Sequence, residues 1–294
     1  MSRRLLFSII IPTYNRAELL KRCLNSVIAQ TYQYWEAIVV DNFSDDNTEE
    51  VVRSFADSRI RFVKNHNYGI IAVSRNKALD MAKGDWICFL DSDDSWFSNK
   101  LEYILPYLKD NDIVYHGYRV TTPKTHFWQR RNFWFYKIKE VSVPYVMQRR
   151  DPLNPSCTSV SREFLADTRF CEDAELRAVE DYDFFLQLIA KKPRVKYLKV
   201  ILTWYELGGN SFDGKAVDRD ILLAEKWNSY LNDEEKKEVD YIHMLDLART
   251  LVAKNDFVHA RELYYEVIHS RIWFKKVEAF KGIVKCRTRI KQIF

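Results

Sequence analysis

Four consecutive polar residues, Asp91-Ser92-Asp93-Asp94, directly follow the apolar segment Trp86–Leu90. In extended backbone, side chains two residues apart point to the same side, so we expect the first and third carboxylates to converge. Clustered carboxylates repel one another unless a cation joins them. Oxygen ligands suit Mg²⁺ or Mn²⁺, ions that proteins commonly share with the phosphates of a substrate. The motif also fits a polar loop that caps the next helix, with Ser95 or Asn99 as the cap.

A second polar group, Pro12-Thr13-Tyr14-Asn15-Arg16, follows the apolar run Leu5–Ile11, and Asp41 follows the run Trp35–Val40. In open α/β sheets, ligands bind beyond the carboxyl ends of the strands. A nucleotide base could stack on Tyr14 there, while the Asp41 carboxylate could accept a hydrogen bond from a base or a ribose. Taken singly, each residue is explained equally well as a helix cap or a turn, and together they favour a binding pocket.

Bringing these two groups together requires a parallel sheet. Short apolar runs, typical of strands buried on both faces, alternate with segments of helical periodicity. Strands are expected at 5–11, 35–40, 60–63, 86–90, 113–118 and 195–204, and helices at about 16–28, from 48, at 71–83 and at 181–190. Asn15 is predicted to cap the first helix, with Glu18 at the third helical position. The alternation predicts a doubly wound α/β sheet.

Beyond Leu207 apolar residues recur only at helical spacing, so we expect a main domain over 1–206 and a helical extension over 207–294. From Arg271 onward the chain has eight basic residues and one acidic residue, a net charge of +7, which leaves −2 for the rest of the +5 total. One helical face carries Trp273, Val277, Phe280 and Val284. A basic helix with aromatic residues can lie on an anionic bilayer, so a peripheral membrane contact through this tail is predicted.

The composition excludes several classes of protein. Among the 294 residues, 47% are hydrophobic and 15% aromatic, which supplies a core and rules out disorder or a small disulfide scaffold. The five cysteines are widely spaced with no CxxC pair, so we expect a reducing, cytoplasmic environment. No run reaches the ~18 apolar residues of a membrane span, and Arg3-Arg4 resembles an export signal only weakly. A nearly neutral body argues against nucleic-acid binding.

Four segments together resemble the nucleotide-sugar-binding half of the family 2 glycosyltransferases, which have the GT-A fold. They are Phe7–Arg16, Ile38–Asn42, Ser74–Leu79 and Gly84–Asp94, in the order and at the spacings of that family. The resemblance is close over residues 6–94 and weaker to about residue 205. It implies a Rossmann-like α/β fold with a mixed, mostly parallel sheet flanked by helices. Residues 1–115 would bind the nucleotide sugar and residues 116–206 the acceptor.

The resemblance also implies roles for single residues. Thr13, Tyr14 and Asp41 would hold the uridine, together with Pro12 and Asn15 of the same loop. Arg75 would approach the diphosphate, Asp91 would reach the ribose beside Ser92, and Asp93 would bind Mn²⁺ or Mg²⁺. The family's later acidic pair matches Glu180-Asp181, which makes Asp181 the general base. By itself, such a pair is an ordinary helix start favoured by the helix dipole.

The implied reaction is the inverting, metal-dependent transfer of one sugar from a UDP-sugar to a hydroxyl of a glycan or lipid-linked acceptor, in the synthesis of a surface polysaccharide or glycoprotein glycan. A metal on the phosphate stabilises the leaving charge, and a carboxylate accepts the acceptor proton. No Gln-x-x-Arg-Trp segment of the processive members is present, so a single addition is expected. Phe43 departs from the small polar residue of many relatives at the rim of the base pocket.

Two other functions remain open from the sequence. An inactive nucleotide-sugar-binding scaffold could use the same fold. Alternatively, Asp91-x-Asp93-x-Ser95 after a strand also resembles a phosphatase motif, in which Asp91 would attack phosphorus. Within the predicted acceptor half, the aromatic and basic stretch 127–136 would stack on a sugar or on single-stranded bases, flank a lipid diphosphate, or form a buried hairpin. Residues 154–159 could form a wall near the donor sugar.

Overall fold

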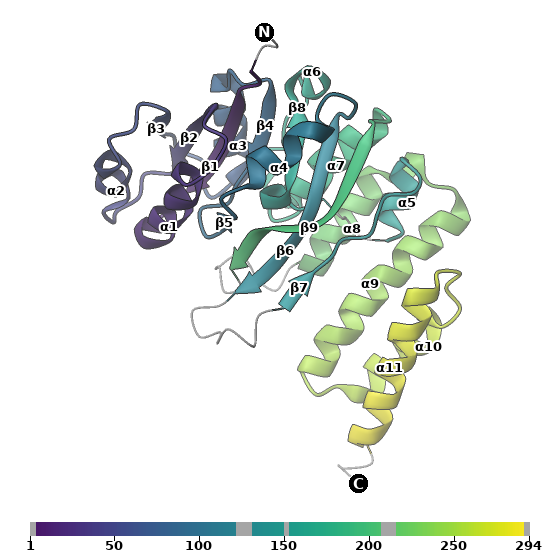
Figure 1. Ribbon diagram of the computed structural model, residues 1–294. Coiled ribbons are helices and arrows are strands. Elements are labelled where there is room, and N and C mark those ends of the chain that lie inside the picture. Colours follow the sequence, from purple (N-terminus) through teal and green to yellow (C-terminus); the bar gives the residue numbers. More distant parts are fainter. Residues whose placement is uncertain (1–3, 122–130, 150–152, 207–215, 291–294) are drawn as a thin grey trace. The chain divides into compact units, whose positions relative to one another are not determined.

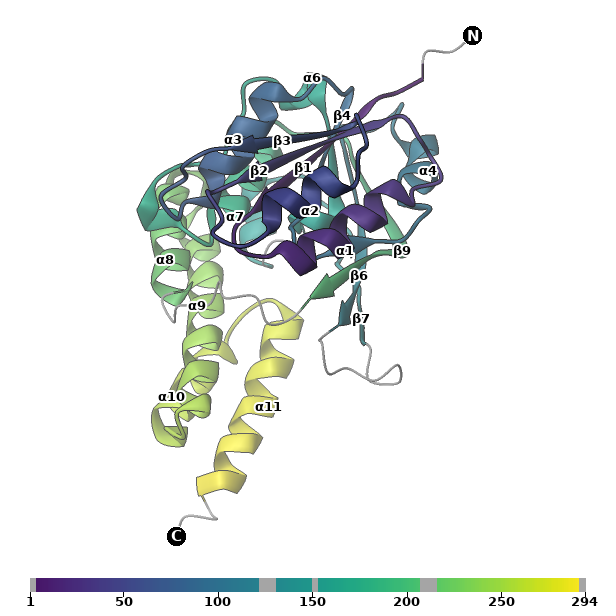
Figure 2. The same ribbon diagram turned by 90° about the vertical axis from the view of Figure 1, so that its left-hand side faces the viewer.

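The computed structural model describes residues 4–121, 131–149, 153–206 and 216–290. Residues 127–130 of the aromatic and basic stretch at 127–136 therefore lie outside the described residues. The chain divides into two compact units, one formed by Met1–Val141 and Pro152–Ser211 and the other by Ser142–Asp151 and Phe212–Phe294. The second unit thus includes a short segment from the predicted acceptor half. Figures 1 and 2 show the elements of each unit.

The described strands of the first unit form one mixed sheet in the order β3-β2-β1-β4-β8-β6-β9-β5, with β7 beside β6. Neighbouring strands from β3 to β4 are parallel, β6 and β9 are parallel, and the other pairs are antiparallel. The strands are β1 (Phe7–Thr13), β2 (Trp35–Asp41), β3 (Ile60–Lys64), β4 (Trp86–Phe89), β5 (Ser95–Trp96), β6 (Ile113–Thr121), β7 (Arg131–Phe133), β8 (Thr158–Ser161) and β9 (Val195–Glu206).

Helices cover this sheet, which confirms the predicted class of a mixed α/β sheet flanked by helices (Figure 2). The expectation of a mostly parallel sheet does not hold for the strand pairs, because four of the eight described pairs are antiparallel. The helices of the first unit are α1 (Ala17–Ile28), α2 (Thr48–Ser54), α3 (Ile71–Met81), α4 (Lys100–Ile104), α6 (Arg162–Leu165) and α7 (Glu180–Ala190). Every residue of β1 and β2 is buried. Alternate residues such as Ile9 and Val39 pack with α1 in the core, while α3 packs on the same two strands. Burial on both faces explains why these strands are continuous apolar runs.

The start of α1 differs from the prediction. Arg16, not Asn15, is the N-terminal cap residue, and its side chain makes no capping bond. Asn15 adopts a left-handed φ of 48°, and its Oδ1 accepts a hydrogen bond from the Asp45 N–H at 2.8 Å. The helix end is satisfied from another loop, because the Ala17 N–H donates to Asp46 Oδ2 at 3.0 Å. A tertiary contact therefore replaces the local cap.

The second unit is helical in its described part, with α5 (Val143–Met147), α8 (Ala216–Lys226), α9 (Asp233–Ala253), α10 (Phe257–Val267) and α11 (Trp273–Ile290). A reciprocal capping box between Asn232 and Glu235 starts α9. Helices α9, α10 and α11 share one core cluster. At Gly282 in α11 a Cβ atom would lie 2.4 Å from the Tyr264 ring, so glycine allows α10 and α11 to approach closely. No helix in the described ranges combines the length and apolar character that crossing a membrane requires.

Candidate functional site

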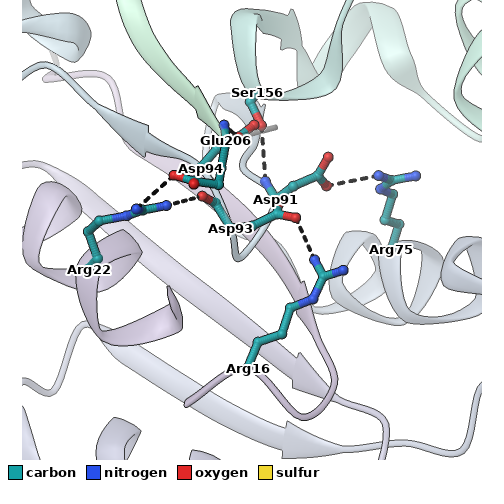
Figure 3. Close-up of polar contacts among 8 residues, drawn as sticks. All are labelled: Arg16, Arg22, Arg75, Asp91, Asp93, Asp94, Ser156 and Glu206. Atoms are coloured by element: carbon teal, nitrogen blue, oxygen red, sulfur yellow. Dashed lines mark hydrogen bonds and ion pairs between the residues drawn. The ribbon is translucent and has the colours of Figure 1, made fainter. Parts of the chain in front are cut away.

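The acidic segment after β4 is a tight turn. The Asp94 N–H donates to the Asp91 carbonyl at 2.9 Å, and the Asp91 N–H donates to Ser156 Oγ at 3.1 Å. The expectation of extended backbone was therefore wrong, because this hydrogen bond closes the chain back on itself. The carboxylates of Asp91 and Asp93 leave the turn toward different arginines (Figure 3). Ser92 is buried within the turn.

Two arginines, the cap residue Arg16 and Arg22 within α1, reach this turn. Arg16 Nη1 lies 2.6 Å from Asp93 Oδ2. Arg22 pairs with Glu206 at 2.9 Å and also donates to the Asp93 carbonyl. Because Arg16 directly follows Asn15, its ion pair brings the loop after β1 to the acidic turn after β4 (Figure 3). The two polar groups singled out in the sequence therefore meet at the carboxyl ends of their strands.

Arg75 of α3 links the acidic turn to the start of α7. Its Nη2 lies 2.9 Å from Asp91 Oδ1, and its Nη1 lies 2.9 Å from Glu180 Oε1. The side chain is only 4% exposed, so both contacts are made in surroundings that screen charge poorly. The residues on either side of Arg75 in α3 have structural roles. Ser74 Oγ accepts a hydrogen bond from the Asn67 side-chain amide. The Asn76 side-chain amide donates to the carbonyl of residue 170 and to the carboxylate of residue 172.

The surroundings of Asp93 and Asp94 disfavour the charged forms of their carboxyl groups. Removal from water, and then the charge of Asp91, raise the pKa of the Asp93 carboxyl above its ordinary value, although Arg16 and Arg22 oppose this. The pKa of Asp94 is raised further by burial and by both neighbouring carboxylates. Asp94 Oδ1 accepts from the Glu206 N–H at 3.0 Å, whereas Asp94 Oδ2 and Glu206 Oε1 are buried with no hydrogen-bond partner. Added positive charge would relieve this cluster.

Asp181 occupies the first turn of α7 beside Glu180. Loss of water contact, and then the Glu180 carboxylate, raise the pKa of Asp181 to about 7, while Arg75 acts in the opposite direction. Asp181 Oδ1 accepts a hydrogen bond from the Tyr182 N–H at 2.8 Å. A carboxylate that titrates near neutral pH is suited to accept a proton during catalysis.

The loop after β1 lies beside the end of β2, where Thr13 pairs with Asp41 across the two strands. The Asp41 carboxylate is buried and accepts from the N–H and hydroxyl of Ser44. Thr13 Oγ1 is buried without a partner, whereas Tyr14 is 48% exposed. Pro12 lies two residues after Ile10, the last β1 residue that pairs with β4. The N–H that proline lacks therefore removes no hydrogen bond from the pairing of β1 with β4.

Phe43 lies two residues after Asp41 and adopts a left-handed φ of 56°. Its ring stacks on His66, with centroids 3.7 Å apart and an angle of 8° between the planes. His66 and Phe43 are both exposed. The unusual residue flagged in the sequence therefore belongs to an aromatic stack formed by the loops after β2 and β3.

Sequence reasoning missed several residues of this site. Arg22 and Glu206 carry no motif, and only the fold brings the last residue of β9 to α1. Ser156 supports the acidic turn through its hydroxyl, and its carbonyl accepts from Trp96, Lys100 and Thr203. The one available signal was the segment 154–159, which the sequence suggested as a wall of the donor site.

Comparison with known proteins relates the chain to a family. Residues 8–169, more than half of the chain, match the model of Glycosyl transferase family 2. Over 117 residues the chain is 43% identical to the UDP-Glc:alpha-D-GlcNAc-diphosphoundecaprenol beta-1,3-glucosyltransferase WfgD of Escherichia coli. This match covers 39% of the chain and 46% of WfgD, so it spans less than half the length of that relative.

Solved structures show the same fold at low sequence identity. S. aureus TarS 1-349 in complex with UDP aligns with a TM-score of 0.62 at 18% identity, covering 99% of this chain and 92% of that structure. The mannosyltransferase PcManGT from Pyrobaculum calidifontis, in complex with GDP-Man and Mn²⁺, aligns with a TM-score of 0.60 at 16% identity, covering 98% and 83%. These likenesses confirm the predicted GT-A class of fold.

Proposed function

We propose that this chain, which belongs to glycosyl transferase family 2, transfers one sugar from a UDP-sugar to a hydroxyl of a glycan or lipid-linked acceptor, with inversion at the anomeric carbon. The observation that carries the proposal is the Arg75 bridge. One buried guanidinium ties Asp91, in the turn that holds Asp93, to Glu180, the neighbour of Asp181. This contact supports the proposal that the groups acting on the leaving diphosphate and on the acceptor proton belong to one site.

Uridine is the proposed nucleotide. Thr13 Oγ1 is buried without a partner, and Asp41 is buried beside it, so both could hydrogen-bond a base or a ribose. Tyr14, with its half-exposed ring, could stack on the base. WfgD is named for UDP-Glc and TarS was solved with UDP, which supports the same choice. The GDP-Man bound by PcManGT makes guanosine the alternative that the assay must compare.

A divalent cation fits the residues of the acidic turn. Asp91 and Asp93 offer hard oxygen ligands, and burial together with the charge of Asp91 raises the pKa of the Asp93 carboxyl, so a cation at Asp93 beside a diphosphate would be stabilised. Within the described ranges, no three His, Cys, Asp or Glu side chains form a metal site by themselves. When bound by Asp93, Mn²⁺ or Mg²⁺ would neutralise charge on the departing diphosphate.

The chemical step follows from Asp181. The acceptor hydroxyl attacks the anomeric carbon, the bond from that carbon to the diphosphate oxygen breaks, and UDP leaves with the electron pair. The Asp181 carboxylate takes the proton of the attacking hydroxyl. Arg75 holds Glu180 and thereby the first turn of α7, so it positions the base; direct contact of Arg75 with the diphosphate stays a prediction.

The proposed acceptor class comes from the relatives. WfgD is named for a diphosphoundecaprenol-linked GlcNAc acceptor, so we place the reaction in the synthesis of a surface polysaccharide. All five cysteines are free thiols, in keeping with the expected cytoplasmic environment. Phosphoryl transfer by Asp91 loses its support, because the family match spans the strand that carries the motif.

The test is turnover with matched substrates. The protein is incubated with UDP-glucose, UDP-GlcNAc, UDP-galactose or GDP-mannose, a lipid-diphosphate GlcNAc acceptor and Mn²⁺, while nucleotide release and product mass are followed. We expect release of UDP with addition of a single sugar, and an inverted anomeric centre by NMR. Binding of UDP-sugars with no release for any acceptor tried would favour the inactive scaffold instead.

A further inference from the structure

Helix α11 has two faces of different character. One face is buried against the rest of its unit and carries Lys275, Ala279, Gly282, Ile283 and Cys286. The opposite face carries Trp273, Phe280 and Val284, which are 75%, 59% and 46% exposed. The apolar stripe seen in the sequence is therefore the outward face of α11 and not its packing face.

The stripe is compact and bordered by cations. At ~100° per residue, Trp273, Val277, Phe280 and Val284 fall within about 60° of one another around the helix. Exposed basic residues border both sides, with Lys276 and Arg287 on one side and Lys281 and Lys285 on the other. Long basic side chains beside an apolar stripe can keep their charges in water while their stems cover apolar surface.

The charge of the exposed face is almost purely positive. Glu278, the one acidic residue in the sequence of α11, is half-buried and pairs with Arg249 of α9. Lys275 does not contribute, because its ammonium is buried and lies 3.0 Å from Glu238 Oε2. In the described part of the basic tail, Lys275 is structural and Arg271 pairs with Glu234. The exposed cations around the apolar side chains are Lys276, Lys281, Lys285 and Arg287.

We infer that this outward face of α11 docks on an anionic lipid bilayer. The aromatic and aliphatic side chains enter the interfacial region, and the flanking cations contact acidic headgroups. A symmetric contact between two copies of the chain would bring like-charged flanks together, which opposes that alternative. The inference does not depend on sugar transfer, since it rests on the residues of α11 alone.

Vesicle sedimentation of the full chain tests this inference. Vesicles of phosphatidylcholine with about 30% phosphatidylglycerol are compared with pure phosphatidylcholine, at 0.1 M and 0.5 M salt. We expect binding to the anionic vesicles, weakened at high salt. The double variant Lys281→Gln/Lys285→Gln should bind about thirtyfold more weakly, from about fivefold for each cation removed.

A matched control removes the same charge elsewhere. Lys237 and Lys254 are exposed in and just after α9, so Lys237→Gln/Lys254→Gln should bind vesicles like the unaltered chain. For the apolar part, Trp273→Gln/Phe280→Gln should lose binding, while Leu247→Gln/Val258→Gln should keep it. Melting curves should be unchanged by substitution of Trp273 and Phe280, because both side chains are exposed.

Three outcomes would overturn the inference. The first is no binding to anionic vesicles by the folded protein. The second is equal loss of binding in the α11 variants and their controls. The third is a dimer in sedimentation velocity that dissociates on Phe280→Gln without any vesicle binding, which would show that a second copy covers the stripe. Normal or failed sugar transfer leaves the vesicle result unaffected, so the two proposals fail separately.

Discussion

Replacing Arg75 by methionine should destabilise the first unit and shift the pH dependence of its activity. The substitution keeps most of the side-chain volume and removes the charge that faces Asp91 and Glu180. Breaking a buried ion pair by removing one partner typically costs about 3–5 kcal/mol. The Glu180 side chain is 6% exposed, whereas Asp91 is 26% exposed and can regain some water, so we expect a loss of about 3 kcal/mol.

Differential scanning calorimetry measures this loss. At ~2–4 °C for each kcal/mol in a unit of this size, the melting temperature should fall by about 6–12 °C. Arg169→Met is the matched control, because Arg169 pairs with Asp80 at 2.9 Å on the surface, where such pairs contribute about 0–1 kcal/mol. Arg75 also lowers the pKa of Asp181, so Arg75→Met should move the acid limb of any activity profile to higher pH. Equal melting of the two variants would refute the buried bridge.

Three further substitutions address single roles. Because burial and Glu180 raise the pKa of Asp181 to about 7, kcat/KM should fall about tenfold per pH unit below pH 7 as the base is protonated. Asp181→Asn should keep the affinity for UDP but lower kcat at least ~100-fold. A turnover assay in which kcat/KM does not change with pH would contradict this role. In calorimetric titrations, Asp93→Asn should abolish any tightening of UDP binding by Mn²⁺, and a normal Mn²⁺ effect in the variant would remove Asp93 from the metal site. Thr13→Val should leave the melting temperature unchanged or raise it, since the threonine hydroxyl is buried without a partner. The same variant should bind UDP about fivefold more weakly. An unchanged affinity for UDP would place the nucleotide elsewhere.

The strands of the parallel half of the sheet could be predicted, because the residues within each segment indicate the strand. The runs that became β1, β2 and β4 are apolar on both faces, and the residues after them are polar, which fixes the strand ends within a few residues. The strands β5, β7 and β8 were missed, because two to four residues carry no clear periodicity.

The polar contacts of the site could not be predicted in the same way. Arg22 meets Glu206 across 184 positions of sequence, and Arg75 meets Glu180 across 105. No spacing rule connects such residues, since only the closure of the sheet brings them together. Asn15 shows the same limit at short range, because a bond to Asp45 holds it in a left-handed conformation that a capping pattern does not reveal.

The most direct test of the proposed activity is the binding of UDP by the purified chain with and without Mn²⁺, followed by thermal shift. A ligand at about 100 times its Kd stabilises the folded state by ~2.7 kcal/mol, or about 5–11 °C for a unit of this size. We predict a shift with UDP and UDP-sugars that Mn²⁺ enlarges, and smaller shifts with GDP and CDP. A folded protein whose melting temperature does not change with any nucleotide, metal present or absent, would contradict the donor site at the ends of β1, β2 and β4.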